Sequence, residues 1–462
     1  MKRCVSLPRL LSRRPLILGT VILTATGLIT RLIGFFYRIY LARLFGEEGM
    51  GIYQLLTPVL SLSFSLCAAA YQTAISKYVA EYPAGSPKRF QTLFAGLRFS
   101  LPLSVLCCAV LYGGADRIAT TLLQEPRTAS MLRILAFSIP FSAVHACING
   151  YFLGLKNTLP PSISQLAEQL TRVGCVYLCT AAIIAEGKTP SINIAVLGLG
   201  AGELVSMTIC LGCIGIAYKR EHTRLVRSAC RAINQIPDAT SRSMLLPIFR
   251  MALPLTLNRL VLNLLQSVEA VSIPARLRIY GYAGSTALRI YGVLTGMALP
   301  MIFFPNALTN AVSVLLLPTI SERQAAGDRD AVRSTILRTL QFCGVMGISC
   351  LSFFLLFGDW IGTTLFDSAL AGHFITTLSF LCPFLYLDAT LSSILQGLGR
   401  AGTIFFMNIT ALLLRLAFVF GAIPRFGITG YLWGMLASQI FLSILYLLCL
   451  GHILHAAGKH AG

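Results

Sequence analysis

The sequence predicts an all-α integral membrane protein with about twelve transmembrane helices in two six-helix lobes. The 462 residues are 56% hydrophobic and only 12% charged, whereas a typical soluble domain is about 25% charged. Apolar runs long enough to cross a hydrocarbon core of about 30 Å recur from end to end. The two halves of the chain also resemble each other, and such internal repeats are typical of transporters.

The apolar runs, divided at charged residues and at Gly/Pro clusters, predict the individual spans. Lysine and arginine are frequent before the first span and between spans 2 and 3, 6 and 7, and 8 and 9, so the positive-inside rule places both termini in the cytoplasm. We expect spans over residues 16–44, 51–80, 92–114, 130–154, 160–185, 192–218, 247–273, 287–319, 334–358, 373–397, 402–424 and 428–453.

These spans define the expected domains. A basic cytoplasmic N-terminus (1–15) precedes an N-lobe (16–218), a basic linker (219–246), a C-lobe (247–453) and a cytoplasmic tail (454–462). The linker region, from Tyr218 to Pro247, includes Lys219, Arg220, Arg224, Arg227 and Arg231 with apolar residues between them. It is either a basic interfacial helix on anionic headgroups or a solvated connection, and both alternatives place it in the cytoplasm.

The internal similarity predicts parallel repeats. ILAFSIPFSAVHACINGYFLGLKN, from Ile134, aligns without gaps with TLSFLCPFLYLDATLSSILQGLGR, from Thr377, and GIYQLLTPVL, from Gly51, resembles RIYGVLTGMAL, from Arg289. Because each half has six helices, matching helices keep the same orientation in the membrane. We therefore expect the substrate cavity at the interface of the two lobes.

Charge and motifs exclude several classes of function. Much of the net charge of +20 lies in short loops, where it sets topology, so nucleic acid is not the expected partner. The chain has no P-loop and no HExxH motif, its six histidines lack ligand spacing, and its fourteen cysteines lie mostly in apolar runs. We expect no enzyme activity, no cofactor and no metal site.

Charged residues inside the spans are the candidate site. An arginine at membrane depth costs roughly 2.5 to 3.5 kcal/mol on insertion scales, so it usually faces a cavity or a partner. Arg31 and Arg38 are seven residues apart, on nearly one helix face and about 10 Å apart along the axis. Guanidinium groups bind phosphate well. The predicted substrate-binding residues are Arg31, Arg38, Arg289, Arg259, Glu269 and Arg172, and Glu168, Glu203, Asp388 and Arg415 are further charges on helices expected to approach the same cavity.

Some of these charges have an alternative explanation. Glu168 and Arg172 have i, i+4 spacing and could simply pair with each other. Arg415 falls at the position of Arg172 in the second repeat and could be its structural counterpart.

GLITRLIGFFYRIYLARLFGEEGMGIYQL followed by AISKYVAEY resembles the stage V sporulation protein B family of polysaccharide exporters, which is related to MurJ-type lipid II flippases and MATE drug exporters. The resemblance implies a MOP/MATE-like fold, alternating access, and a bacterial cytoplasmic membrane protein that moves an undecaprenyl-diphosphate-linked sugar. Arg31 with Ile33, Gly34 and Phe35 matches the MurJ-type pattern, whereas Tyr37 and Arg38 favour the sporulation-type branch.

The resemblance and the charges predict a flippase for a peptidoglycan or polysaccharide precursor similar to lipid II. Its partners would be the lipid-linked oligosaccharide, membrane lipids, and a coupling ion that is either sodium or a proton. The main alternative is a cation-coupled exporter of small organic molecules, for which a cavity carboxylate such as Glu269 or Glu203 would be essential. A scaffold without transport activity is a third alternative, and buried charge argues against it.

Overall fold

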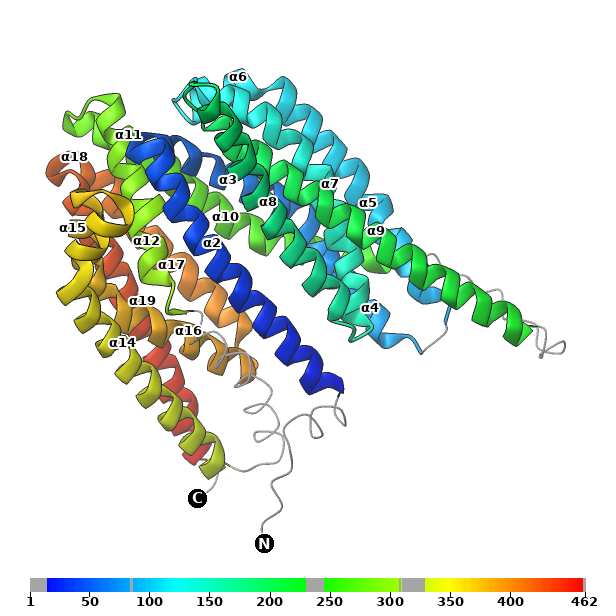
Figure 1. Cartoon of the computed structure of the whole chain (residues 1–462). Helices are drawn as coiled ribbons and strands as arrows, with labels where there is room; N and C mark the ends of the chain where they lie inside the picture. Colours follow the sequence, from blue (N-terminus) through cyan, green and yellow to red (C-terminus); the bar gives the residue numbers. More distant parts are fainter. Residues whose placement is uncertain (1–14, 84–85, 230–244, 307–308, 310–328, 460–462) are drawn as a thin grey trace, which may run out of the picture. The chain divides into compact units, whose positions relative to one another are not determined.

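The structure is a computed structural model that describes residues 15–83, 86–229, 245–306, 309 and 329–459 (Figure 1). These residues form helices and no strand. Eleven of the helices or helix groups are long and apolar enough to cross a membrane, and α8 (Leu159–Ala185) matches a twelfth expected span. The prediction of an all-α membrane protein with about twelve spans is confirmed. The helices fall into two compact units.

Unit 1 comprises the described residues up to Gly34 and Leu56–Leu264. Helix α7 lies at its centre and packs against α4, α5 and α9, while α8 packs mainly against α9 (Figure 1). Tyr151, Ile75 and Cys147 belong to its apolar core. Its elements are the first part of α2 (Pro15–Gln54), α3 (Leu56–Phe64), η1 (Ser65–Ala69), α4 (Ala70–Glu81), α5 (Lys88–Gly113), α6 (Ala115–Arg117), η2 (Ile118–Leu122), α7 (Thr128–Gly154), α8, α9 (Asn193–Ala229) and the first part of α10 (Leu245–Tyr280).

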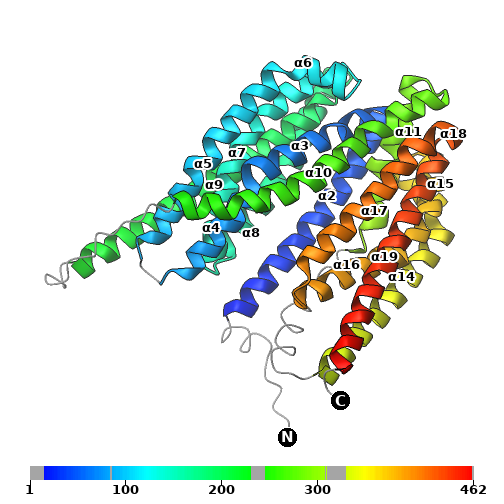
Figure 2. The ribbon, with the colours of Figure 1, turned by 180° about the vertical axis from the view of Figure 1, so that it is seen from behind.

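Unit 2 comprises Phe35–Leu55 and the described residues from Leu265 onward. Figure 2 shows α14, α16, α17 and α19 running alongside one another. Tyr446, Ile394 and Leu395 belong to its apolar core. After the remainders of α2 and α10, its elements are α11 (Gly284–Gly292), η3 (Val293–Ala298), α12 (Leu299–Phe303), α14 (Arg329–Phe366), α15 (Ala369–Leu378), η4 (Ser379–Leu381), α16 (Cys382–Gly397), α17 (Ala401–Gly421), α18 (Ile423–Phe426) and α19 (Ile428–Lys459).

The first helix of each repeat is divided between the units. The boundary falls after Gly34 in α2 and after Leu264 in α10. α2 and α10 are thus both divided between the two units, as expected for the corresponding first helices of two parallel repeats. The predicted assignment of residues 16–218 to one lobe and 247–453 to the other stays a prediction.

The end of α2 differs from the prediction. The helix expected to end at residue 44 continues to Gln54 across a kink at Gly46 (φ 69°), and α3 starts at Leu56 rather than at residue 51. The polar residues on both sides of Gly46 contact other segments of unit 2. Arg43 donates from Nε to the carbonyl of Leu365 at 2.8 Å, and Glu47 pairs with Arg289.

Close backbone contact holds the same segment in place. A Cβ added to Gly292 would lie 2.3 Å from the carbonyl oxygen of Glu47 and 2.3 Å from the backbone nitrogen of Gly51. A Cβ on Gly51 would in turn lie 2.1 Å from the carbonyl oxygen of Leu288. Small residues permit this close helix approach, as they do in membrane proteins generally.

Other helices extend beyond their predicted ends. α10 continues to Tyr280 rather than 273, and α14 covers Arg329–Phe366 rather than 334–358. The predicted ends were set where the apolar run meets the first charged residues. The helical hydrogen bonding of the backbone continues beyond that point, because long charged side chains can extend from the helix into water. α9 similarly continues through the basic residues to Ala229, which makes the first part of the expected linker helical. Residues 230–244, and nearly all of the expected eighth span beyond residue 306, lie outside the described residues.

Candidate functional site

Arg31 and Arg38 of α2 both have exposed side chains within a candidate span, Ile22–Gln54. Arg31 makes no hydrogen bond or ion pair with any residue that the structure describes. A guanidinium within a membrane span is unfavourable unless a partner, water or a cavity compensates for its charge. Arg31 is therefore available to an anionic ligand.

Arg289 has a protein partner. Its Nε forms an ion pair with a carboxylate oxygen of Glu47, and the other oxygen of Glu47 accepts a hydrogen bond from Ser368. The Arg289 side chain is 58% exposed and that of Glu47 is 17% exposed. Arg289 thus anchors the end of α2 within unit 2, and it keeps enough exposure to contact another anion.

Two other predicted site residues lie in partly buried ion pairs. Arg172 donates from Nη2 to Glu168 Oε1 at 2.6 Å, as the i, i+4 alternative predicted. Glu269 accepts a hydrogen bond from Arg415 Nη2 at 2.7 Å and another from the Tyr431 hydroxyl at 2.7 Å. Arg415 Nε also lies 2.6 Å from Glu269 Oε1, but its N–H does not point at that oxygen. The charges of Arg172 and Glu269 are therefore balanced within their own units.

Arg259 lines a polar cavity of about 490 Å³ in unit 1, called here the basic cavity. Its other lining residues are Gln72, Thr73, Ser76, Lys77 and Leu153. The volume falls within the range of roughly 300 to 1,000 Å³ of small-molecule pockets. Arg259 Nη2 lies 3.5 Å from Thr73 Oγ1, and Lys77 is only loosely paired with Glu81, at 4.0 Å between half-exposed side chains. Two cations and three neutral polar groups thus face one cavity.

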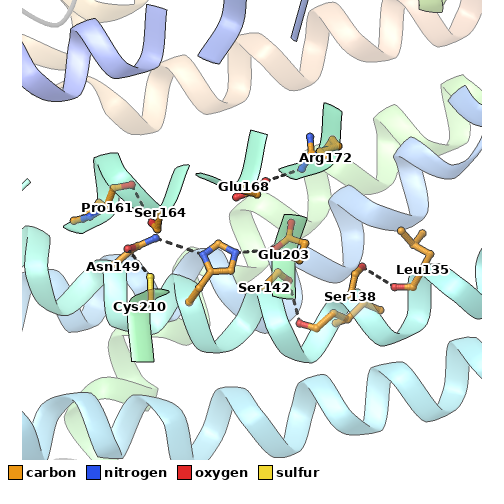
Figure 3. A network of polar contacts seen from close by, with 12 residues as sticks. Leu135, Ser138, Ser142, Asn149, Pro161, Ser164, Glu168, Arg172, Glu203 and Cys210 are labelled. Carbon is orange, nitrogen blue, oxygen red and sulfur yellow. Dashed lines mark hydrogen bonds and ion pairs between the residues drawn. The ribbon is translucent and has the colours of Figure 1, made fainter. Parts of the chain in front are cut away.

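A second polar group, the buried charge cluster, consists of His145, Glu168, Arg172 and Glu203. It joins α7, α8 and α9 in unit 1 (Figure 3). His145 Nε2 lies 2.7 Å from Glu203 Oε2, and both side chains are 12% exposed. Figure 3 shows Asn149 and Cys210 continuing the network, with Cys210 Sγ 3.4 Å from Asn149 Oδ1.

The buried charge cluster could accommodate a cation by geometry. One atom each of His145, Glu168 and Glu203 lie within 4.8 Å of one another. However, Arg172 already supplies a positive charge to Glu168 at 2.6 Å. One carboxylate, that of Glu203, then remains for the imidazole of His145.

Asp388 is a buried carboxylate in unit 2. It lies on α16, is 5% exposed, and accepts hydrogen bonds from Gln439 Nε2 and from Ser443 Oγ, the latter at 2.7 Å. Both donors are neutral. The sequence analysis expected Asp388, Glu269 and Arg415 to face the substrate cavity. In the structure, each of these charged groups instead contacts side chains of unit 2.

The sequence did not reveal two of these features. Lys77 was visible only as part of AISKYVAEY, and its role in the basic cavity depends on α4 meeting α10 in unit 1. The histidines lack ligand spacing in the sequence, and spacing could not reveal the contact of His145 with Glu203, which is 58 residues away. The repeat alignment offered a signal, since it places His145 opposite Asp388.

Residues 16–324 match the family model described as polysaccharide biosynthesis protein. The chain belongs to this family. It is 28% identical over 440 residues to stage V sporulation protein B of Bacillus subtilis (strain 168), covering 94% of this chain and 83% of that protein. It is 22% identical to the lipid II flippase MurJ of the same organism over 361 residues, covering 73% of this chain and 64% of that protein.

Solved structures with the same fold include two transporters. The inward-facing conformation of a multidrug resistance MATE family transporter of the MOP superfamily has a TM-score of 0.69 at 14% identity, covering 96% of this chain and 100% of that chain. The inward closed conformation of the lipid II flippase MurJ has a TM-score of 0.70 at 13% identity, covering 93% of this chain and 87% of that chain. The chain is a multi-pass membrane protein of the polysaccharide biosynthesis family with the fold of these two transporters, as its sequence predicted.

Proposed function

We propose that the protein moves a lipid-linked peptidoglycan or polysaccharide precursor, similar to lipid II, across the bacterial cytoplasmic membrane by alternating access. The basic cavity of unit 1 is the observation that carries this proposal. Arg259 and Lys77 line it together with Gln72, Thr73 and Ser76. A fork-shaped guanidinium, an ammonium and neutral hydrogen-bonding groups suit a diphosphate and the sugar attached to it.

The internal repeat supports a ligand role for Arg31. The alignment that matches Ile52 with Ile290 and Thr57 with Thr295 places Arg31 opposite Glu269. In the second repeat, Glu269 neutralises Arg415. In the first repeat the corresponding position is itself cationic, and Arg172 takes its counterion from Glu168 instead. The first repeat therefore carries an extra cation, which an anionic substrate would neutralise.

The predicted site residues differ in what they offer a substrate. Arg31, Arg38 and Arg259 have exposed side chains, and we propose that they attract the diphosphate. Arg289 could contribute through its exposed face. Arg172 and Glu269 are balanced by their own partners, so a role in substrate binding would require those pairs to open.

Translocation of fluorescent lipid II in proteoliposomes tests the proposal. We expect wild-type protein to move the lipid, and Arg31→Ala, Lys77→Ala and Arg259→Ala each to reduce the rate by tenfold or more, about the effect of losing 1.4 kcal/mol of substrate interaction. Arg425→Ala, at an exposed arginine of α18, is the matched control and should transport normally. Wild-type rates in Arg31→Ala, Lys77→Ala and Arg259→Ala alike would refute this assignment of the site.

The alternative function is cation-coupled export of small organic molecules. The buried carboxylates of Glu203 and Asp388 favour it, because such exporters need a protein group that binds the coupling ion. Wild-type protein that moves organic cations but not lipid II, and that loses this activity in Asp388→Asn, would favour this alternative.

We also propose that both termini lie in the cytoplasm. The continuation of α9 through Lys219 and further basic residues to Ala229 supports this orientation, because basic segments next to a span stay on the cytoplasmic side and bind anionic headgroups.

A further inference from the structure

The buried charge cluster has a net charge that depends on one proton. Arg172 balances Glu168, to which it donates at 2.6 Å. Among the described residues, the group that pairs with Glu203 is His145, at 2.7 Å. With a neutral imidazole the cluster carries one negative charge, and with a protonated imidazole it is neutral. A net charge among membrane-spanning helices is unfavourable, so the protonated state is stabilised while the cluster stays closed.

The groups that face His145 come from two helices. α9 contributes Glu203, and α8 contributes Glu168 with its partner Arg172. On its own helix, Asn149 Nδ2 lies 3.4 Å from His145 Nδ1. α4 and α5, which also pack against α7, add no electrostatic partner to His145 among the described residues. The proton on His145 is therefore held chiefly by one carboxylate.

The position of His145 carries a titratable side chain in both repeats. The ungapped register that pairs Phe137 with Phe380 and Phe141 with Phe384 places His145 opposite Asp388.

The partner positions also correspond. A Cβ on Gly198 would meet Val176 of α8, and one on Gly434 would meet Phe418 of α17. Aligning these two glycines places Glu203 opposite Gln439, since each follows its glycine by five residues. Gln439 contacts Asp388, as Glu203 contacts His145. The geometry is shared between the repeats, and among the described residues it is the first repeat that combines a base with two carboxylates and an arginine.

We propose that His145, paired with Glu203, binds and releases one proton in each transport cycle, which makes the first repeat the site of proton coupling. This inference rests on the proposed transport function and specifies its coupling ion. While His145 and Glu203 are in contact, the imidazolium is stabilised by the carboxylate. A rearrangement that separates α7 from α9, or admits water between them, removes that stabilisation and lets the proton leave the imidazole ring.

Two measurements test the proposal. First, purified protein in detergent is titrated between about pH 5 and pH 9, a range that brackets the ordinary imidazole pKa. His145→Gln should release one proton fewer over this range than wild type. Second, lipid II translocation in proteoliposomes should respond to an imposed pH gradient in wild type. Glu203→Gln, which keeps the shape of the side chain, should lose that response.

Controls separate this site from general effects of substitution. His373→Gln replaces an exposed histidine on α15, and Glu186→Gln replaces an exposed carboxylate that pairs with Lys188. Both should keep the wild-type response to the gradient. A full gradient response in His145→Gln or Glu203→Gln would overturn the proposal, as would identical titration curves for His145→Gln and wild type. A protein that moves no lipid II but takes up a proton at His145 would support the proton site and refute the lipid II function.

Discussion

Replacing Glu269 by glutamine should destabilise unit 2 strongly. The side chain of Glu269 is 6% exposed in its ion pair and that of Arg415 is 23% exposed. Removing one partner of a buried pair costs about 3 to 5 kcal/mol, because the other charge stays buried without compensation. The partial exposure of Arg415 favours the lower value. A loss of about 3 kcal/mol shifts the unfolding equilibrium roughly a hundredfold toward the unfolded state.

The Tyr431 hydroxyl increases this cost. It donates to Glu269 Oε1 at 2.7 Å in the native protein. A glutamine amide could accept that bond through its oxygen, but its nitrogen would then face the guanidinium of Arg415, so donor would meet donor. The carboxylate is therefore the group that satisfies both neighbours at once.

Equilibrium unfolding in mixed micelles, followed by circular dichroism, measures the effect. Glu269→Gln should unfold at lower denaturant than wild type. The double variant Glu269→Gln/Arg415→Gln, which removes both charges, should recover part of the loss because two amides can hydrogen-bond to each other. A single variant as stable as wild type, or a double variant that is less stable by the sum of both single effects, would refute the argument that Glu269 acts through the buried pair.

Further predictions concern packing, a surface pair and topology. Gly292→Val should block assembly of unit 2, because a Cβ there would lie 2.3 Å from backbone atoms; a folded variant at wild-type yield in gel filtration would contradict this. Arg289→Ala and Glu47→Gln should each cost little stability, with a coupling of about 1 kcal/mol or less in a double-mutant cycle, since Arg289 is 58% exposed; a coupling above 3 kcal/mol would show a buried pair. In a cysteine-free background, Thr189→Cys should react with an impermeant maleimide added outside cells and Ser86→Cys should not; the reverse pattern would invert the proposed topology.

The fold could be predicted well from the sequence because membrane insertion imposes a strong pattern. Spans need about 20 apolar residues, and the expected helices agree with those described. The errors lie where polar residues are held by contacts between distant segments. The predicted break at residue 44 overlooked Glu47 and Arg43, whose partners Arg289 and Leu365 are hundreds of residues away. A local pattern cannot show such partners.

The candidate site was only partly predictable for the same reason. The i, i+4 pair of Glu168 and Arg172 follows from helix geometry, and the structure contains it. The basic cavity around Arg259 and the contact of His145 with Glu203 depend on tertiary packing. Charged residues in spans thus identify which helices matter, whereas the structure is needed to show which charges already have protein partners.

Comparison of the repeats suggests how the two halves divide the work. Arg31 and Arg38 of the first repeat align with Glu269 and Arg276 of the second. In the second repeat both positions are occupied by internal contacts: Glu269 binds Arg415, and the Arg276 guanidinium stacks over the ring of Phe420 with its carbon 4.6 Å from the centroid.

Arg31 in the first repeat has no such contact within the described part of the chain. A duplicated membrane protein tolerates an unneutralised cation only where water, a cavity or a ligand compensates for it. The same repeat holds the histidine whose protonation sets the charge of its buried cluster. We therefore infer that the first repeat supplies both the anion-binding charge and the proton site, while the second repeat uses the same positions for internal stability.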